Sequence, residues 1–177
     1  PYLLTEPYFG ADFAAVDAFA LEMDVEADDE RRVEAGILFE LSYNLTNGHT
    51  FIPEKKLIPA TAALLNLDSD TVECGLDRLS EQERMVRSEI AGLTACYLPE
   101  FYEAEQYITE RLARMARTRI EPPRTLEKKL SGVQKKNAIQ YAQSQLQAIR
   151  DAASYQLLLV TGGPGTGKTT VMTGILD

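Results

Sequence analysis

Eight residues close to the C-terminal end of the sequence have the types and the spacing of a phosphate-binding loop. The run Gly162–Thr169 matches the pattern G-x-x-x-x-G-K-[ST] at every position. Glycines allow such a loop to turn its backbone N–H groups toward phosphate oxygens, and Lys168 offers a positive charge to the β- and γ-phosphates. The Thr169 hydroxyl is suited to ligating Mg²⁺, and we assign catalytic roles to Lys168 and Thr169. The predicted nucleotide-binding residues are Gly163, Pro164, Gly165, Thr166, Gly167, Lys168, Thr169 and Thr170.

Two elements must position this loop. The apolar run Gln156–Thr161 predicts a strand buried on both faces, and the residues from about Thr169 onward predict a helix whose N-terminus faces the phosphates. A single strand does not make a stable sheet. Only eight residues follow Thr169, too few to include the acidic residue that completes such a magnesium site. We therefore expect the sequence to be a piece of a larger motor protein, and Pro1 in place of a starting methionine supports this.

Composition excludes several classes of protein. A chain of 177 residues with 45% hydrophobic content can bury a sizeable core in one or two domains. The sequence has no apolar run of 18 residues and no signal-peptide pattern, so nothing indicates a membrane. Cys74 and Cys96 lack the spacing of a metal or redox site, and we interpret them as reduced thiols of a cytoplasmic protein. With His49 as the sole histidine, we expect neither a zinc site nor a catalytic triad.

Charge is distributed unevenly along the chain. The net charge of −9 combines 7 Lys/Arg against 20 Asp/Glu in residues 1–100 with 11 against 7 in residues 101–177. Between Arg111 and Lys136 the count is 9 against 2. A polyanion such as DNA should therefore meet the second half of the chain, whereas the acidic first half favours a protein partner.

The N-terminal residues predict two helices joined by a short turn. Apolar residues recur at helical spacing over residues 12–23 and 29–45, and Asp12 is placed to cap the first helix. The pair resembles half of a helix-hairpin-helix module, in which turn amides hold a DNA phosphate. Because five acidic residues cluster between Asp24 and Glu30, we expect a structural role instead.

A winged-helix-like unit is predicted next. Helices over residues 55–65 and 69–79 are followed by short strands over residues 84–89 and 93–98. A winged helix that reads DNA needs basic residues on its second helix, but this helix offers three acidic side chains and Arg78 alone. We interpret the unit as a scaffold or as a surface for a protein partner.

A long helix is predicted from Pro99 to about Arg119, and Pro122-Pro123 ends it. Its arginines form either a solvated basic face or a surface that follows a phosphate backbone, and the sequence leaves both interpretations open. The stripe expected to be buried consists of Ala104, Ile108, Leu112 and Met115. The exposed side is expected to carry Arg111, Arg114, Arg117 and Arg119.

The segment before the loop makes the sequence similar to a known family. From Ile139 to Ile149 the chain reads I-x-Y-A-x-S-Q-x-x-A-I, and an apolar stretch and T-G-G-P-G-T-G-K-T-T follow. This combination resembles the RecD-like family of superfamily 1 DNA helicases, also called exodeoxyribonuclease V alpha-subunit-like, and especially its stand-alone members with an N-terminal extension. The pieces that look like that extension are Ala35-Gly36-Ile37-Leu38, Gly48-His49-Thr50 and Phe51-Ile52-Pro53.

The resemblance implies an ATP-dependent helicase that moves 5′ to 3′ in DNA recombination and repair. Its partner would be single-stranded DNA or a duplex with a 5′ overhang, bound through the full motor. In that family a glutamine ahead of the first motor strand reads the adenine, and spacing places it at Gln145, whereas Gln134 lies too far upstream. The family's hairpin usually has a glycine-rich turn, but residues 10–13 include Asp12, which would repel phosphate. The alternatives are another P-loop ATPase, such as an AAA+ protein, and an N-terminal protein-docking module.

The predicted fold is mainly α-helical in the N-terminal region and continues into the start of an α/β RecA-like P-loop domain. We expect a helix-hairpin-helix-like region over residues 1–50 and a winged-helix-like region with its β-hairpin over residues 51–98. A basic helix and linker over residues 99–124 and the motor domain over residues 125–177 would follow. Such a fragment alone is expected neither to hydrolyse ATP usefully nor to unwind DNA.

Overall fold

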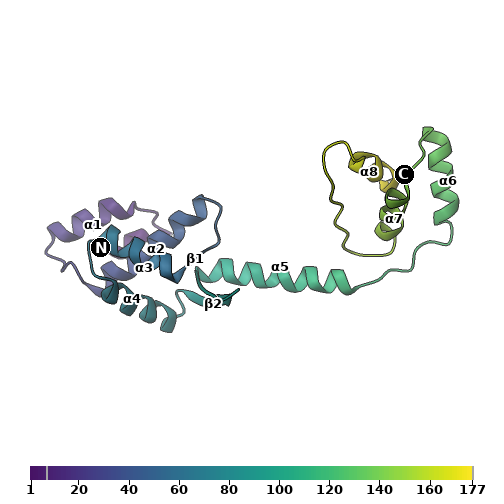
Figure 1. The fold of residues 1–177 in the computed structure, drawn as a ribbon. Coiled ribbons are helices and arrows are strands. Elements are labelled where there is room, and N and C mark those ends of the chain that lie inside the picture. The colour runs from purple at the N-terminus through teal and green to yellow at the C-terminus, as the bar shows by residue number, and fades with distance from the viewer. Residues whose placement is uncertain (7, 177) are drawn as a thin grey trace. The chain divides into compact units, whose positions relative to one another are not determined.

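The computed structural model describes residues 1–6 and 8–176 and divides the chain into two compact units (Figure 1). The first unit extends from Pro1 to Glu105, and the second begins at Gln106. None of the helices among the described residues is long and apolar enough to cross a bilayer. The elements are η1 (Tyr2–Thr5), α1 (Phe13–Glu22), α2 (Glu30–Thr46), β1 (Phe51–Pro53), α3 (Glu54–Leu65), α4 (Ser69–Glu81), β2 (Val86–Ile90), β3 (Leu93–Tyr97), α5 (Pro99–Arg117), α6 (Leu126–Asn137), α7 (Gln143–Ala152) and α8 (Lys168–Leu176).

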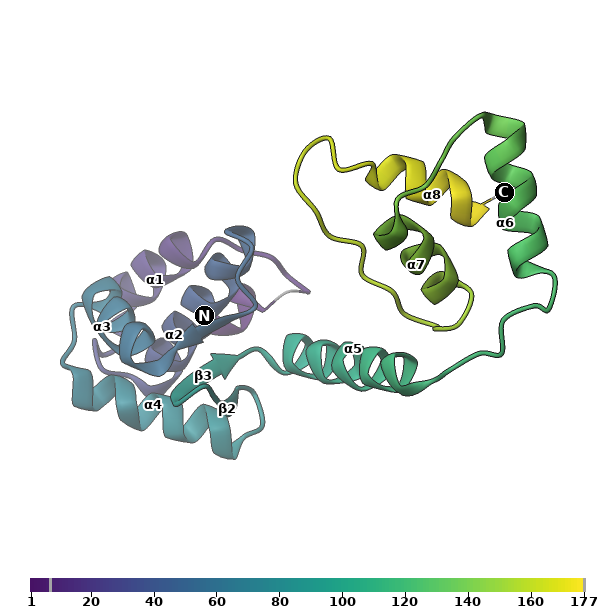
Figure 2. The same cartoon turned by 45° about the vertical axis from the view of Figure 1, so that its right-hand side comes forward.

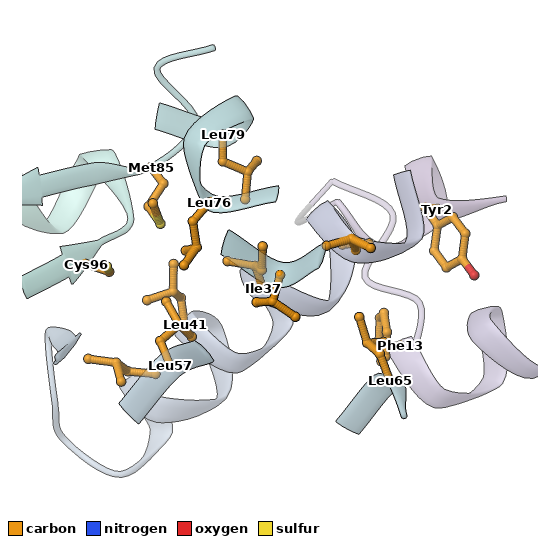
Figure 3. Close-up of a cluster of buried hydrophobic side chains, with 14 of the residues drawn as sticks. Tyr2, Phe13, Ile37, Leu41, Leu57, Leu65, Leu76, Leu79, Met85 and Cys96 are labelled. Carbon is orange, nitrogen blue, oxygen red and sulfur yellow. The ribbon is translucent and has the colours of Figure 1, made fainter. Parts of the chain in front are cut away.

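The first unit is built around an extensive hydrophobic core, part of which Figure 3 shows. Apolar residues at helical spacing on α2, α3 and α4 point into it, and Ile37, Leu57 and Leu76 are each 0% exposed. Full burial of such a side chain contributes about 2 kcal/mol from the apolar area removed from water. The core runs without interruption from Tyr2 to Cys96, so it includes residues on both sides of position 50. The domain boundaries suggested by the sequence stay predictions.

A three-stranded antiparallel sheet closes this unit, with the strands in the order β1-β3-β2. The central strand pairs Cys96 with Ile52 of β1 on one side and with Arg87 of β2 on the other. The β2–β3 turn places Ala91 and Gly92 at φ of 49° and 79°, which a tight two-residue hairpin turn requires at both positions. The hairpin and the two helices before it occur in the predicted order, but the winged-helix interpretation stays a prediction.

Aspartates begin three of the helices of the first unit. In each case the side-chain carboxylate accepts a hydrogen bond from an amide of the first turn, which would otherwise have no partner. At α1 this places the negative charge of Asp12 on the amide of Ala15, so the start of that helix is already occupied by an anion. The pairs are Asp12 with the Ala15 N–H at 3.0 Å, Asp29 with Arg31 at 2.9 Å and Asp68 with Thr71 at 2.8 Å.

A buried ion pair joins α1 to α2. Arg32, only 4% exposed, donates from Nε to Asp17 Oδ1 at 2.8 Å and from Nη2 to Oδ2 at 2.9 Å. Its Nη1 donates to the carbonyl oxygens of Ala27 and Leu65, at 2.5 and 3.1 Å. The Tyr2 hydroxyl donates to the same carboxylate at 2.6 Å. The network is fully hydrogen-bonded, as a charge pair must be to remain inside a protein.

The second unit contains helices α6, α7 and α8 (Figure 2), which a smaller hydrophobic cluster holds together. Its buried members are Leu130, Tyr141, Ile149 and Val171. From Thr125 to about Ala153, and again from about Thr169, the sequence predicts helical structure, and α6, α7 and α8 confirm it. Helices α7 and α8 pack directly against each other.

Two expectations about the second half of the chain are wrong. Residues 157–160 form no strand, and Leu159 is 81% exposed, because the described residues from Gln106 onward provide no neighbouring strand to complete the hydrogen bonds. Among those residues the β-type pairing is limited to an isolated bridge between Arg119 and Tyr155. The expected buried stripe on α5 is also wrong, since none of its described residues is buried.

Candidate nucleotide-binding site

The predicted phosphate loop leads from Thr161 into α8, which begins at Lys168. Gly165 and Gly167 have φ of 74° and 79°, in the left-handed region where a side chain would be strained. A Cβ placed on Gly163 or Gly165 would have no atom within 4 Å. The loop therefore turns as its glycines permit, and its Gly163–Gly165 side faces open space that a ligand could occupy.

The Lys168 side chain folds back over this loop. Its Nζ donates hydrogen bonds to the carbonyl oxygens of Gly162 and Gly163, both at 2.7 Å. The Thr166 hydroxyl donates to the Gly163 carbonyl at 2.9 Å and closes the same turn. Both acceptors of the ammonium are neutral carbonyl oxygens, whereas a phosphate oxygen carries a negative charge that also attracts the ammonium. An anion entering the loop would therefore compete well for Lys168.

The first turn of α8 offers further groups to an anion and a cation. Its initial amides have no acceptor within the helix, because the first backbone bond closes only at Val171, whose N–H donates to the Gly167 carbonyl at 3.0 Å. Thr169 is exposed, and its hydroxyl makes no hydrogen bond to another residue in the described part of the chain. A free hydroxyl oxygen beside the loop fits Mg²⁺, which prefers hard oxygen ligands.

Gln145, in the first turn of α7, is brought to the loop by the fold. Its Oε1 accepts from the Ala142 N–H at 2.9 Å, and its Nε2 donates to the Thr166 carbonyl at 3.4 Å. A Cβ on Gly167 would lie 2.4 Å from that nitrogen, but the nitrogen ends a flexible side chain that can move aside, so it is the φ of 79° that favours glycine here. A carboxamide has two N–H groups and two lone pairs, so Gln145 keeps one of each for a ligand.

Four residues that were not assigned to the site from the sequence hold its helices in place: Gln134, Tyr141, Ile149 and Gly174. Tyr141 is 5% exposed, and an ideal Cβ on Gly174 would lie 2.7 Å from its Oη and 2.7 Å from Ile149 Cδ1. Gln134 accepts from the Tyr141 N–H at 3.2 Å and so fixes the connection between α6 and α7. Gly174, inside the predicted helix, was the available signal in the sequence, since a glycine within a helix often marks a close approach of a neighbouring element. Gln134 thus supports the site without facing the loop.

The informative contact among the predicted residues is between Gln145 and the loop. Residues 163–170 are consecutive, so their proximity follows from the chain itself, whereas Gln145 and Thr166 are 21 positions apart. The structure joins α7, the loop and α8 into one assembly around an open turn. The roles assigned to these residues toward a nucleotide stay predictions.

Comparison with known proteins gives matches at both ends of the chain. The ATP-dependent RecD2 DNA helicase HHH domain matches residues 1–51, and an AAA domain matches residues 145–177. An ATP-dependent RecD2 DNA helicase from Deinococcus radiodurans is 30% identical over 162 residues, which cover 85% of this chain and 22% of the relative. The chain belongs to the RecD-like helicase family.

The two regions that match RecD-like proteins lie in different units of the structure. The HHH match includes η1, α1, α2 and the start of β1, while the AAA match begins at Gln145 and includes the loop and α8. The glutamine that contacts the loop is thus the first residue of the matched domain. The chain spans about a fifth of the length of its RecD2 relative.

Proposed function

We propose that this RecD-like chain carries the ATP-binding loop and N-terminal extension of a DNA helicase. The parent would move 5′ to 3′ on single-stranded DNA, starting from a single strand or a 5′ overhang, in recombination and repair. The observation that supports the proposal most is the contact between Gln145 and the Thr166 carbonyl, which joins a base-reading side chain to the phosphate loop. The family match at both ends of the chain points to the same activity.

Lys168 would exchange the two carbonyl oxygens it now contacts for phosphate oxygens of ATP. The exchange replaces neutral acceptors by charged ones and releases the loop carbonyls to water. Thr169 would supply its free hydroxyl to Mg²⁺, and the initial amides of α8 would complete the anion site. Bound MgATP supplies the free energy of hydrolysis, whereas these residues position the phosphates and offset their charge.

Gln145 would recognise the base. Adenine presents an N6 donor and an N7 acceptor on one edge, and the N–H and lone pair that remain on the Gln145 carboxamide match that pair. Because its other N–H is bonded to the loop, base recognition would be coupled to loop position. This coupling explains why position 145 would need a glutamine, which can hydrogen-bond to the base and to the loop together, and not an apolar residue.

Binding of a fluorescent ATP analogue to the chain tests the site. Lys168→Ala should weaken binding by tenfold or more, since the positive charge that would contact the phosphates is lost. Gln145→Ala should weaken ATP but not GTP by about tenfold, corresponding to a pair of lost hydrogen bonds. Gln143→Ala, an exposed glutamine in the same turn of α7, is the matched control and should change neither. Unchanged binding in Lys168→Ala would contradict the nucleotide site.

Strand separation by the intact protein tests the helicase assignment. A duplex with a 5′ overhang should be unwound in the presence of ATP, and Lys168→Ala should abolish unwinding. An AAA+ ATPase of another function would hydrolyse ATP and leave the duplex paired. A duplex with only a 3′ overhang is the control for direction and should stay paired.

A protein-docking role for the first unit is the second candidate. It is favoured by Asp12, which places a carboxylate on the α1 amide that a phosphate would have to use. A DNA titration of the chain with Asp12→Asn at low salt distinguishes the roles. Tighter DNA binding by this variant would indicate that the first unit faces DNA, and unchanged binding would favour a protein partner.

A further inference from the structure

The part of α5 that belongs to the second unit is largely exposed, and only Ala113 and Met115 are partly covered. Tyr107, Ile108 and Leu112 are 68%, 54% and 43% exposed, and no described residue of the helix is buried. Exposed apolar and aromatic side chains on a regular helix indicate that something else covers it in the working protein.

One side of this helix combines an aromatic ring with a row of arginines, which we call the basic α5 face. It consists of Tyr107, Arg111, Arg114 and Arg117, whose spacings of four, three and three residues place them along one side of the helix. All four are exposed, and none of the arginines forms an ion pair with any residue that the structure describes. Glu110 lies on the same stretch and forms none either.

The chain beyond this face adds positive charge and does not neutralise it. Of the two acidic residues between Arg111 and Lys136, Glu127 is already paired with Arg150, Nε to Oε1 at 2.7 Å, and only Glu121 is left for nine basic residues. Arg119 lies over the Tyr155 ring, with its guanidinium carbon 5.2 Å from the ring centroid. The Ile120 N–H donates to the Ser154 carbonyl at 2.8 Å. These contacts tie the end of the basic helix to the segment that leads into the loop.

The chemistry of this face fits single-stranded DNA more closely than an acidic protein. Unpaired arginines match a row of phosphates, and every base of single-stranded DNA has a flat face on which an exposed tyrosine can stack, whereas the carboxylates of an acidic peptide supply charge alone. We propose that Arg111, Arg114 and Arg117 bind consecutive phosphates of single-stranded DNA and that Tyr107 stacks on a base. The choice of DNA rests on the proposed function; the face itself rests on the exposed tyrosine and the unpaired arginines.

Binding of a labelled oligothymidine to the full chain at several salt concentrations tests this surface. Arg111→Gln/Arg114→Gln should lower the slope of log K against log salt by about 1.4, at about 0.7 per lost phosphate contact. Lys55→Gln/Lys56→Gln in the first unit removes the same charge from exposed positions and is the matched control. Its slope should equal that of the unchanged chain. Tyr107→Ala should weaken binding by about tenfold, and Tyr107→Phe should retain it.

The outcomes separate this surface from the nucleotide site. Equal slopes in the two charge variants would overturn the proposal, even where the ATP analogue still binds in a Lys168-dependent manner. Competition by polyglutamate as effective as that by oligothymidine would overturn it too, and would assign the face to an acidic protein. Loss of nucleotide binding with an intact slope difference would leave this surface standing while the proposed helicase site fails.

Discussion

The two units of this chain differ in how many of their basic side chains form ion pairs. In the first unit five of the seven Lys and Arg residues form ion pairs, whereas of the eleven from residue 101 onward only Arg150 does so among the described residues. The first unit also has the larger core, with Glu34 buried between Arg78 and Arg84. The second leaves most of its loop glycines and the arginines of α5 exposed. A region whose charged groups are paired is suited to stabilising a fold. A region whose polar groups still lack partners is suited to binding a ligand.

The largest test of this difference is removal of Arg32 from the buried network. Arg32→Met keeps the volume but leaves the Asp17 carboxylate without its cation, and breaking a buried pair on one side costs about 3–5 kcal/mol. Hydrogen exchange measured by mass spectrometry should show faster exchange throughout the first unit and no change around the phosphate loop. Equal acceleration in both units would show that they are not independently stabilised.

The neighbouring arginine is the control for this substitution. Arg31 pairs with Asp29 at 2.7 Å, but its side chain is 70% exposed, so solvent screens the interaction. Arg31→Met should therefore leave the free energy of unfolding almost unchanged. A cost equal to that of Arg32→Met would mean that burial does not decide the strength of these pairs.

A glycine-to-alanine pair sharpens the comparison of packing. A Cβ on Gly75 would lie 2.6 Å from Val33 Cγ1 and 3.0 Å from Ile37 Cδ1, inside the first core. Overpacking costs about 1–3 kcal/mol, and the helix propensity of alanine returns about 1 kcal/mol, so Gly75→Ala should destabilise by about 1 kcal/mol. Gly132→Ala on α6 meets no atom within 4 Å and should stabilise by up to about 1 kcal/mol. Urea unfolding should show a lower free energy of unfolding for Gly75→Ala and a higher one for Gly132→Ala. A higher value for Gly75→Ala would contradict the packing described.

The helices of both units could be predicted from the sequence because their signals are local. Capping aspartates such as Asp12 and apolar residues four apart, as in Ile37 and Leu41, act within one or two turns. The β2–β3 hairpin was equally readable from its Ala91-Gly92 turn. The match of residues 162–169 to the loop pattern was visible for the same reason.

Features that depend on distant partners could not be read in this way. The run 157–160 has the composition of a buried strand, but a strand needs a neighbour, and none lies among the described residues from Gln106 onward. The stripe containing Ile108 and Leu112 has the periodicity of a buried face, yet periodicity does not say what covers it. The Arg32–Asp17 pair joins residues 15 positions apart, and no local pattern in the sequence announced it.

The smallest expected effect is the loss of stability at low pH, which can be compared through one carboxylate in each unit. Burial alone would raise the pKa of Asp17, but hydrogen bonds from Arg32 and Tyr2 hold it below its usual value of 3.8. Its contribution to stability is therefore present above that value and is lost as the pH falls through the lowered pKa of the folded state. The hydrogen bond from Arg150 likewise lowers the pKa of Glu127, but that pair is exposed to solvent, which weakens its contribution.

Urea unfolding at neutral pH and at about pH 3, followed by NMR amide signals assigned to each unit, measures the two contributions separately. The first unit should lose more stability on acidification than the second. Tyr2→Phe removes one of the hydrogen bonds that lower the pKa of Asp17, so the acid dependence of the first unit should become shallower. Glu127→Gln should leave the first unit unchanged and should alter the second only slightly, because an exposed pair gives it little to lose. An acid dependence of the first unit that Tyr2→Phe leaves unaltered would show that Asp17 is not its source, and the contrast between the units would then rest on packing alone.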